Sequence, residues 1–199
     1  MSESSDDAET TDDIMRATYR ALFQHGYSAT TISKIADEFD KSKSLIYYHY
    51  EDKEELLGAF LEYLLDQLES DLAASDGEDP KSHLLEIVDL LLPSELEDER
   101  FTFLRALLEL RAQAPYHESY REQFERSDEL VVSLLVEAIE WGIEEDVFRA
   151  VNSREVAEFV YSTAYGAIER GVTVDDPSVL HENRGYIESY LEATLFKYS

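Results

Sequence analysis

Cysteine is absent from the 199 residues, and glycine and proline are scarce, at seven and four. A chain without cysteine has no disulfide, thiolate metal site or cysteine nucleophile, which favours a reducing cytoplasm. Few glycines and prolines leave long windows in which apolar residues recur at three- and four-residue steps, the helical period. We therefore predict an all-α chain of about nine helices, in one large or two smaller units.

Long apolar runs are missing as well. The longest uncharged apolar stretch, Phe159 to Ile168, is about half of the roughly 20 residues that span a bilayer. Residues 1–11 are acidic and polar, without the basic stretch or apolar centre of a signal peptide. We predict that they form a disordered lead-in and that the protein is cytoplasmic, with no membrane partner.

Positive charge is the third scarcity. The formal net charge is -28, which disfavours nucleic-acid binding and is typical of a salt-adapted organism. The six lysines are unevenly spread, however, since Lys34, Lys41, Lys43 and Lys53 fall within one 20-residue window. In a chain this poor in lysine, the cluster indicates a polyanion site, although a chance grouping on a solvated face is the alternative.

The lysine window lies over two predicted short helices, the second and third of the chain. They follow a longer first helix, which runs from about Asp12 to His25 and ends at Gly26. Thr30 or Thr31 can cap the second helix and Ser42 the third, in which Ile46 faces inward. The residues predicted to project outward are Lys43, Ser44, Tyr47 and Tyr48. This arrangement describes a helix-turn-helix, which can enter a major groove about 12 Å wide.

The remaining helices form the predicted body. Asp52 and Glu55 have the spacing of a capping box and begin a long fourth helix, so we place a helix-turn-helix domain at 12–55 and a helical domain at 56–199. The eighth helix, capped by Ser153, is apolar on nearly every side between Val156 and Ile168. Such a helix is covered on both sides, by a partner or by an ordinary core.

Two segments carry a family resemblance. Residues 14–36 (IMRATYRALFQHGYSATTISKIA) and 42–57 (SKSLIYYHYEDKEELL) resemble the N-terminal domain of the tetracycline-repressor (TetR) family. The most specific pieces are residues 23–31 and the run Tyr47-Tyr48-His49-Tyr50 with Asp52-Lys53-Glu54.

The resemblance implies a role for each matching residue. Base edges would be read by Lys43, Ser44 and Tyr47, and phosphates would be held by Tyr48, His49 and Lys53. At helix starts, Thr31 and Ser42 would meet the phosphate backbone. As an alternative, Tyr47 or Tyr48 could be half-buried core residues and Ser42 only a cap.

The turn departs from the family pattern. Asp40 stands where the family has a glycine with positive φ, and Lys41 where an apolar residue is usual. Leu45 replaces a small hydroxyl residue, so it would touch a thymine methyl or pack internally. We expect this turn to distinguish the chain from its relatives.

The helix count of the C-terminal part is similar to the ligand-sensing and dimerisation domain of the same family. That resemblance implies a homodimer through the last two helices, which places two reading heads on a palindromic site. It also implies an effector pocket, for which the candidates are Arg105, Glu109, Gln113, Tyr116, His117, Trp141 and Tyr165. Each of these alone is more often structural, and a pocket needs several to converge.

The predicted function is a sequence-specific transcriptional regulator, a repressor that a small-molecule ligand releases from its double-stranded DNA operator. We predict no catalytic residue, metal or cofactor. A carboxylate-bridged metal enzyme is the main rival, but no histidine follows Glu or Asp by three residues, and Gly-x-Gly and His-Glu-x-x-His motifs are absent. The other rival is a helical interaction protein that has lost DNA binding.

Overall fold

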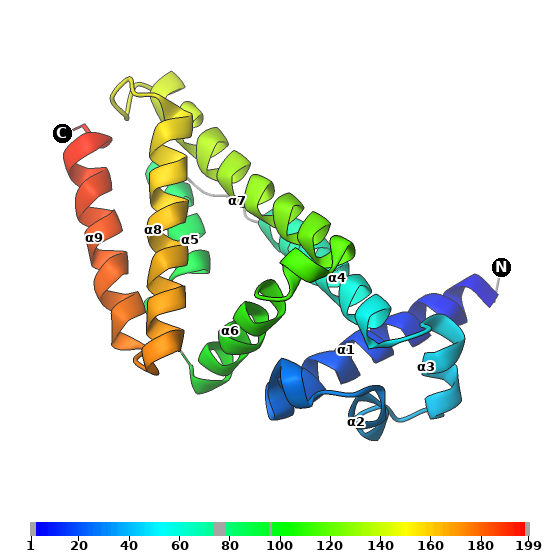
Figure 1. Cartoon of the computed structure of the whole chain (residues 1–199). Coiled ribbons are helices and arrows are strands. Elements are labelled where there is room, and N and C mark those ends of the chain that lie inside the picture. The colour runs from blue at the N-terminus through cyan, green and yellow to red at the C-terminus, as the bar shows by residue number, and fades with distance from the viewer. Residues whose placement is uncertain (1–2, 74–78, 96, 198–199) are drawn as a thin grey trace. The chain divides into compact units, whose positions relative to one another are not determined.

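Helices make up the computed structural model, which describes residues 3–73, 79–95 and 97–197. Within these residues the all-α prediction is confirmed, since the elements are nine α-helices and one 3₁₀ turn, η1 (Figure 1). The elements are α1 (Glu3–Ala29), α2 (Ile32–Asp37), α3 (Lys43–His49), α4 (Lys53–Ala73), α5 (Pro80–Leu91), α6 (Asp98–Arg111), η1 (Ala114–Tyr116), α7 (Glu118–Glu144), α8 (Ser153–Val174) and α9 (Ser178–Thr194).

The helices group into two compact units that differ from the predicted domains. The first unit comprises the chain up to Leu68 together with Thr102–Glu125, and the second comprises Glu69–Phe101 and the chain from Arg126. A boundary at residue 55 therefore does not separate them. Helices α4, α6 and α7 each contribute residues to both units.

One hydrophobic core explains why the first unit is larger than a helix-turn-helix. The inner face of α1 is buried as its periodicity predicts, and it packs in one cluster with the start of α4 and with residues of α6 and α7. Phe60, Tyr120 and Leu110 are fully buried members of this cluster. Because these contacts join residues far apart in the sequence, local periodicity could not predict them.

The local signals of the helix-turn-helix are confirmed. Gly26 interrupts α1 with a φ of +68°, as a glycine at a helix end does. Thr31 caps α2 by accepting a hydrogen bond from the Lys34 amide at 3.3 Å, and Ser42 caps α3 through the Ser44 amide at 3.3 Å.

The start of α4 forms a variant of the predicted capping box. The Glu55 amide donates to the Asp52 carboxylate at 2.9 Å. The Glu55 carboxylate in turn accepts from the amide of Glu51, one residue earlier than in the standard arrangement, at 2.6 Å. The cap therefore also ties down the link that leaves α3.

The predicted disordered lead-in is wrong for the part that the structure describes, because α1 begins at Glu3 rather than near Asp12. Thr10 is buried and accepts a hydrogen bond from Lys41 at 3.3 Å, while Asp13 pairs with the same ammonium at 2.9 Å. Asp12 accepts from the Tyr63 hydroxyl at 2.8 Å. No local signal marks these contacts, because the partners, Lys41 in the turn before α3 and Tyr63 of α4, lie far away in the sequence.

In the second unit, α8 and α9 run side by side, and α5 also packs on α8 (Figure 1). The buried face of α8 consists mainly of small and β-branched residues, including Ala157, Ala164 and Ala167. Its cap is Asn152 rather than the predicted Ser153, since the Asn152 side chain accepts from the Glu155 amide. The guanidinium of Arg184 on α9 binds the Asp89 carboxylate and the Leu92 carbonyl near the end of α5.

Tyr120 provides a test of the first core. Its hydroxyl is buried without a hydrogen-bond partner among the described residues, and burial, followed by the charges of neighbours that include Glu54, raises the pKa of Tyr120. Removing an unpaired polar group relieves a penalty of about 1–3 kcal/mol. We expect Tyr120→Phe to leave the free energy of unfolding unchanged or higher in urea titration, whereas Tyr120→Ala should lower it by about 3–5 kcal/mol. A clear loss in Tyr120→Phe would show that the hydroxyl is satisfied.

Candidate nucleic-acid interface

Helix α3 presents a polar and aromatic face to solvent. Ile46 is fully buried, whereas the Tyr47 and Tyr48 side chains are 52% and 79% exposed. Lys43 and Ser44 are exposed on the same helix. The alternative in which these tyrosines belong to the core is therefore wrong. Contact of this face with DNA remains a prediction.

The outward face is held in place by its own polar contacts. The Lys43 ammonium donates to the Ser33 hydroxyl of α2 at 2.7 Å and lies 5.6 Å from the centre of the Tyr47 ring. The Ser42 and Ser44 hydroxyls lie 2.7 Å apart. These contacts connect the two short helices and orient the side chains that we predicted would read bases.

The turn between α2 and α3 forms without the strain that its sequence indicates. Among the described residues, Asp146 and Asp175 are the only non-glycine residues with a positive φ, so Asp40 adopts an ordinary backbone conformation. Lys41 turns toward α1, where it binds Asp13 and Thr10. Leu45 is half-buried and packs against the core of the unit. The departures from the family pattern thus serve packing within the first unit.

Two of the predicted phosphate anchors are engaged inside the protein. The Lys53 ammonium donates to the Tyr27 carbonyl at 2.7 Å and lies 4.0 Å from the centre of the Tyr27 ring. Burial lowers the pKa of Lys53, an effect that nearby Glu54 opposes. His49 is half-buried, with its ring 5.2 Å from that of Tyr48 in an edge-on arrangement. Their contact with phosphates stays a prediction.

The seven predicted effector residues do not form one group. Arg105, Glu109, Gln113, Tyr116 and His117 belong to the first unit, whereas Trp141 and Tyr165 belong to the second. Glu109 accepts a hydrogen bond from the Tyr27 amide at 2.7 Å, and His117 stacks on Tyr120 with ring centres 4.9 Å apart. Tyr116 is 80% exposed. Glu109 and His117 thus make contacts inside the protein and Tyr116 faces solvent, while a role of the seven residues toward an effector stays a prediction.

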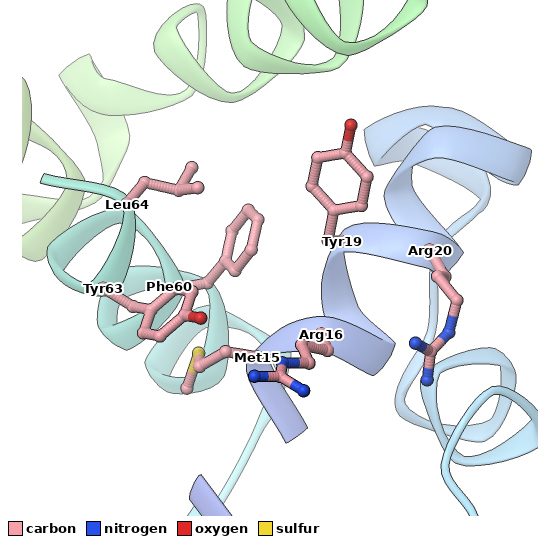
Figure 2. Close-up of a pocket in the computed structure, with 7 residues that line it drawn as sticks. All are labelled: Met15, Arg16, Tyr19, Arg20, Phe60, Tyr63 and Leu64. Carbon is pink, nitrogen blue, oxygen red and sulfur yellow. The ribbon is translucent and has the colours of Figure 1, made fainter. Parts of the chain in front are cut away.

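A cleft in the first unit lies between α1 and α4 and has a volume of about 250 Å³ (Figure 2). Sequence patterns gave no signal for it, and none of the predicted effector residues lines it. The lining residues are Met15, Arg16, Tyr19, Arg20, Phe60, Tyr63 and Leu64. Both arginines already bind acidic partners, Asp12 and Glu38 respectively, so this cleft has no free cation at its rim.

The missed residue with the clearest chemical signal lies in the second unit. The Nδ1 atom of His83 is buried and has no hydrogen-bond partner among the described residues. The His83 ring meets the Trp141 ring edge-on, with centres 6.0 Å apart. The sequence offered no motif around His83, because α5 and α7 are brought together only by the fold.

The described ranges hold neither a cluster of metal ligands nor a membrane-spanning helix. No three histidine, aspartate or glutamate side chains there gather in the way that metal ligands do. None of the helices within them combines the length and apolarity that crossing a bilayer requires.

Comparison with known proteins supports both the all-helical fold and the N-terminal helix-turn-helix. The profile of the bacterial regulatory proteins, tetR family, matches residues 14–60, and that of the BetI-type transcriptional repressor C-terminal region matches residues 80–195. The transcriptional regulator AcrR of Shigella flexneri is 30% identical over 103 residues, 50% of this chain and 48% of the relative. BetI of Stenotrophomonas maltophilia (strain R551-3) is 30% identical over 79 residues, 38% and 40% of the two chains.

These alignments cover less than half the length of the two curated relatives, but solved structures align along nearly the whole chain. A TetR transcription regulator from Haloarcula marismortui ATCC 43049 is 38% identical, with a TM-score of 0.87 over 94% of this chain and 99% of its own. A transcriptional regulator from Saccharomonospora viridis, solved in complex with choline, is 19% identical, with a TM-score of 0.79 over 96% and 100%. The chain therefore belongs to the TetR family of transcriptional regulators, with a C-terminal region of the BetI type.

Proposed function

We propose that the protein is a DNA-binding transcriptional regulator, a repressor whose α3 helix enters the major groove of an operator. The observation that carries this proposal is the outward face of α3, where Lys43, Tyr47 and Tyr48 are exposed while Ile46 anchors the helix. Lysine can donate to guanine O6 and N7, and a tyrosine hydroxyl can bond bases or phosphates. Family membership supports this use of the face, since the TetR family consists of regulators rather than enzymes.

The net charge of -28 makes the placement of each lysine important. Lys41 and Lys53 are directed toward Asp13 and the Tyr27 carbonyl, so Lys43 is the lysine best placed to meet DNA from α3. Repulsion between an acidic body and phosphates is screened over about 8 Å at physiological salt and over less at higher salt. Screening therefore makes the acidic body tolerable next to DNA in a salt-rich cytoplasm, in keeping with the predicted salt-adapted origin.

The DNA-binding proposal is tested by comparing lysines of different orientation. Duplex fragments from around the coding region of the protein are titrated with the parent, Lys43→Met, Tyr47→Phe and the control Lys41→Met. We expect Lys43→Met and Tyr47→Phe to weaken binding by about 1–3 kcal/mol, the value of one base contact, and Lys41→Met to leave it nearly unchanged. If the parent binds no duplex at any salt concentration, the chain is an interaction protein that has lost this function.

We further propose that α8 and α9 form the homodimer interface. Phe159 on α8 is 46% exposed and stacks on Tyr190 of α9 with ring centres 4.2 Å apart, and Tyr186 is 63% exposed. A Cβ atom added at Gly166 or Gly185 would meet nothing within 4 Å, so both glycines border open space. Exposed aromatics beside small residues suit close packing of a second pair of helices in a four-helix bundle.

The dimer proposal predicts a specific effect of Gly166→Arg. The new side chain finds room in the protomer but would project into the partner, so the molecular mass measured by light scattering after gel filtration should fall from that of two chains to one. Glu137→Arg, at an exposed position of α7, serves as the control and should remain dimeric. A Gly166→Arg protein that stays dimeric would place the interface elsewhere.

For the effector, we propose a site beside Trp141 in the second unit. The Nδ1 atom of His83 has no hydrogen-bond partner among the described residues, and the His83 ring lies 6.0 Å from that of Trp141. A polar group next to an aromatic surface is typical of small-molecule sites. The Saccharomonospora viridis regulator of similar fold binds choline. Because quaternary ammonium ions are recognised by aromatic faces, and best by tryptophan, choline is the first compound to examine.

Thermal unfolding in a choline titration tests this site. A ligand that binds only the folded state stabilises it by about 2.7 kcal/mol at one hundred times its dissociation constant, so the midpoint should rise. The rise should disappear in Trp141→Leu and persist in Tyr116→Leu, which removes a predicted effector residue in the first unit. A midpoint that choline does not move excludes choline as the effector, and a rise retained in Trp141→Leu moves the site away from this ring.

A further inference from the structure

Lys41 lies in the turn between α2 and α3, one residue before Ser42, the cap of α3. Its ammonium is bound on α1, by the Asp13 carboxylate at 2.9 Å and by the Thr10 hydroxyl at 3.3 Å. Thr10 is buried, whereas the Lys41 and Asp13 side chains are 40% and 38% exposed. Residues three apart on a helix share one face, so the two partners hold the ammonium together on α1, within reach of solvent.

Lys43, two residues further along, has partners of a different kind. Its ammonium donates to the neutral Ser33 hydroxyl at 2.7 Å and lies 5.6 Å from the centre of the Tyr47 ring. When Lys43 leaves the Ser33 hydroxyl for a phosphate oxygen, no opposite charges are separated. When Lys41 leaves Asp13, an ion pair is broken. The two lysines therefore differ in how readily they can neutralise a phosphate.

The other end of the same turn shows the same use of an acidic residue. Glu38 follows α2, and its carbonyl accepts from the Arg20 guanidinium of α1 at 2.7 Å, while its carboxylate lies 3.6 Å from the Arg20 Nε atom. Cations on both sides of the turn are thus paired with acidic residues across the gap to α1. The pairing of Lys41 with Asp13 belongs to this arrangement.

The pair affects what Lys41 can contribute to DNA binding. A lysine that neutralises a phosphate releases a condensed cation from the duplex, and this release makes binding favourable and salt-dependent. If Lys41 moved to a phosphate, Asp13 would become an uncompensated carboxylate close to the DNA. The carboxylate then either repels the phosphates or takes up a cation, and both effects offset the release. Lys41 therefore gains little from a phosphate while Asp13 is present.

We propose that Asp13 restrains DNA binding by holding Lys41 on α1, away from the phosphates next to α3. This inference rests on the proposed function and adds a regulatory residue to it. The Asp13 carboxylate lowers both the affinity for duplex DNA and the dependence of that affinity on salt. Lys41 makes no contact with DNA in the parent protein, although it lies in the lysine-rich window of the sequence.

The ion pair is first tested without DNA, by urea unfolding of the parent, Asp13→Ala, Lys41→Met and the double variant. A pair that forms in solution makes the two substitutions non-additive. The unfolding equilibrium constant of the double variant should be about two- to fivefold below the value expected from the single variants. The difference should shrink at about 1 M salt, where the screening length is about 3 Å. Additive effects would refute the proposal.

The affinity for duplex fragments from around the coding region is then measured at several salt concentrations. Asp13→Ala releases Lys41 to one phosphate, so the fall of log K with log salt should become steeper by about 0.9. The affinity of Asp13→Ala relative to the parent should be raised at low salt and should fall about eightfold for each tenfold rise in salt. Adding Lys41→Met to Asp13→Ala should return affinity and slope to the parent values.

Glu9→Ala is the matched control, because Glu9 is an exposed acidic residue one turn before Asp13 on the same helix. It removes the same charge without releasing Lys41, so the slope should stay that of the parent. An equal gain in Glu9→Ala, or a gain that survives the addition of Lys41→Met, would show that Asp13 acts by general repulsion. Either result overturns the proposal.

The proposed function and the restraint by Asp13 fail in different ways. If no variant binds duplex at any salt concentration, the DNA-binding function is wrong and the restraint is refuted with it. If the parent binds duplex and Asp13→Ala binds with the same affinity and slope, the function stands and only the restraint is refuted.

Discussion

The burial of one apolar core in the first unit is the constraint on which the helix-turn-helix of α2 and α3 depends. A helix-turn-helix of two short helices cannot bury enough surface alone, and α2 contributes only Ile32 and Ile35 and α3 only Ile46 as buried residues. Each large apolar side chain contributes about 1.5–3 kcal/mol when fully buried. Phe60 of α4 and Tyr120 of α7 are the largest fully buried side chains of this core. The helix-turn-helix is therefore stable only together with helices that continue into the second unit.

Charge is the second constraint, because cations are few and acidic groups abundant. Several of these cations form ion pairs between separate elements. Arg154 of α8 binds both oxygens of Glu129 on α7 at 2.9 Å, and Lys41 joins the turn before α3 to α1. Exposed ion pairs contribute about 0–1 kcal/mol each, so these pairs orient helices more than they stabilise them. The same use of cations leaves Lys43 as the lysine on the exposed face of α3.

Several features could be predicted because their causes are local. Residues within a few positions of each other determine these features. They are the interruption of α1 at Gly26, the caps Thr31 and Ser42, and the outward direction of Tyr47 and Tyr48. The exposure of the candidate DNA face was predicted correctly for this reason, and its contact with DNA stays a prediction. Convergence of the proposed effector residues could not be predicted in this way, since it depends on contacts between distant helices, and Glu109, for example, binds the Tyr27 amide. Their role toward an effector stays a prediction.

The sequence by itself determined the helical class, the position of the helix-turn-helix and the family, since periodicity, caps and a compact motif are encoded within short windows. Tertiary structure alone decided which charged groups remain available. It placed Lys41 on Asp13, Lys53 on the Tyr27 carbonyl and His83 against Trp141, and it extended α1 back to Glu3. The physical reason is that a charged side chain binds whichever partner the folded core brings within about 3 Å, whatever their separation in sequence.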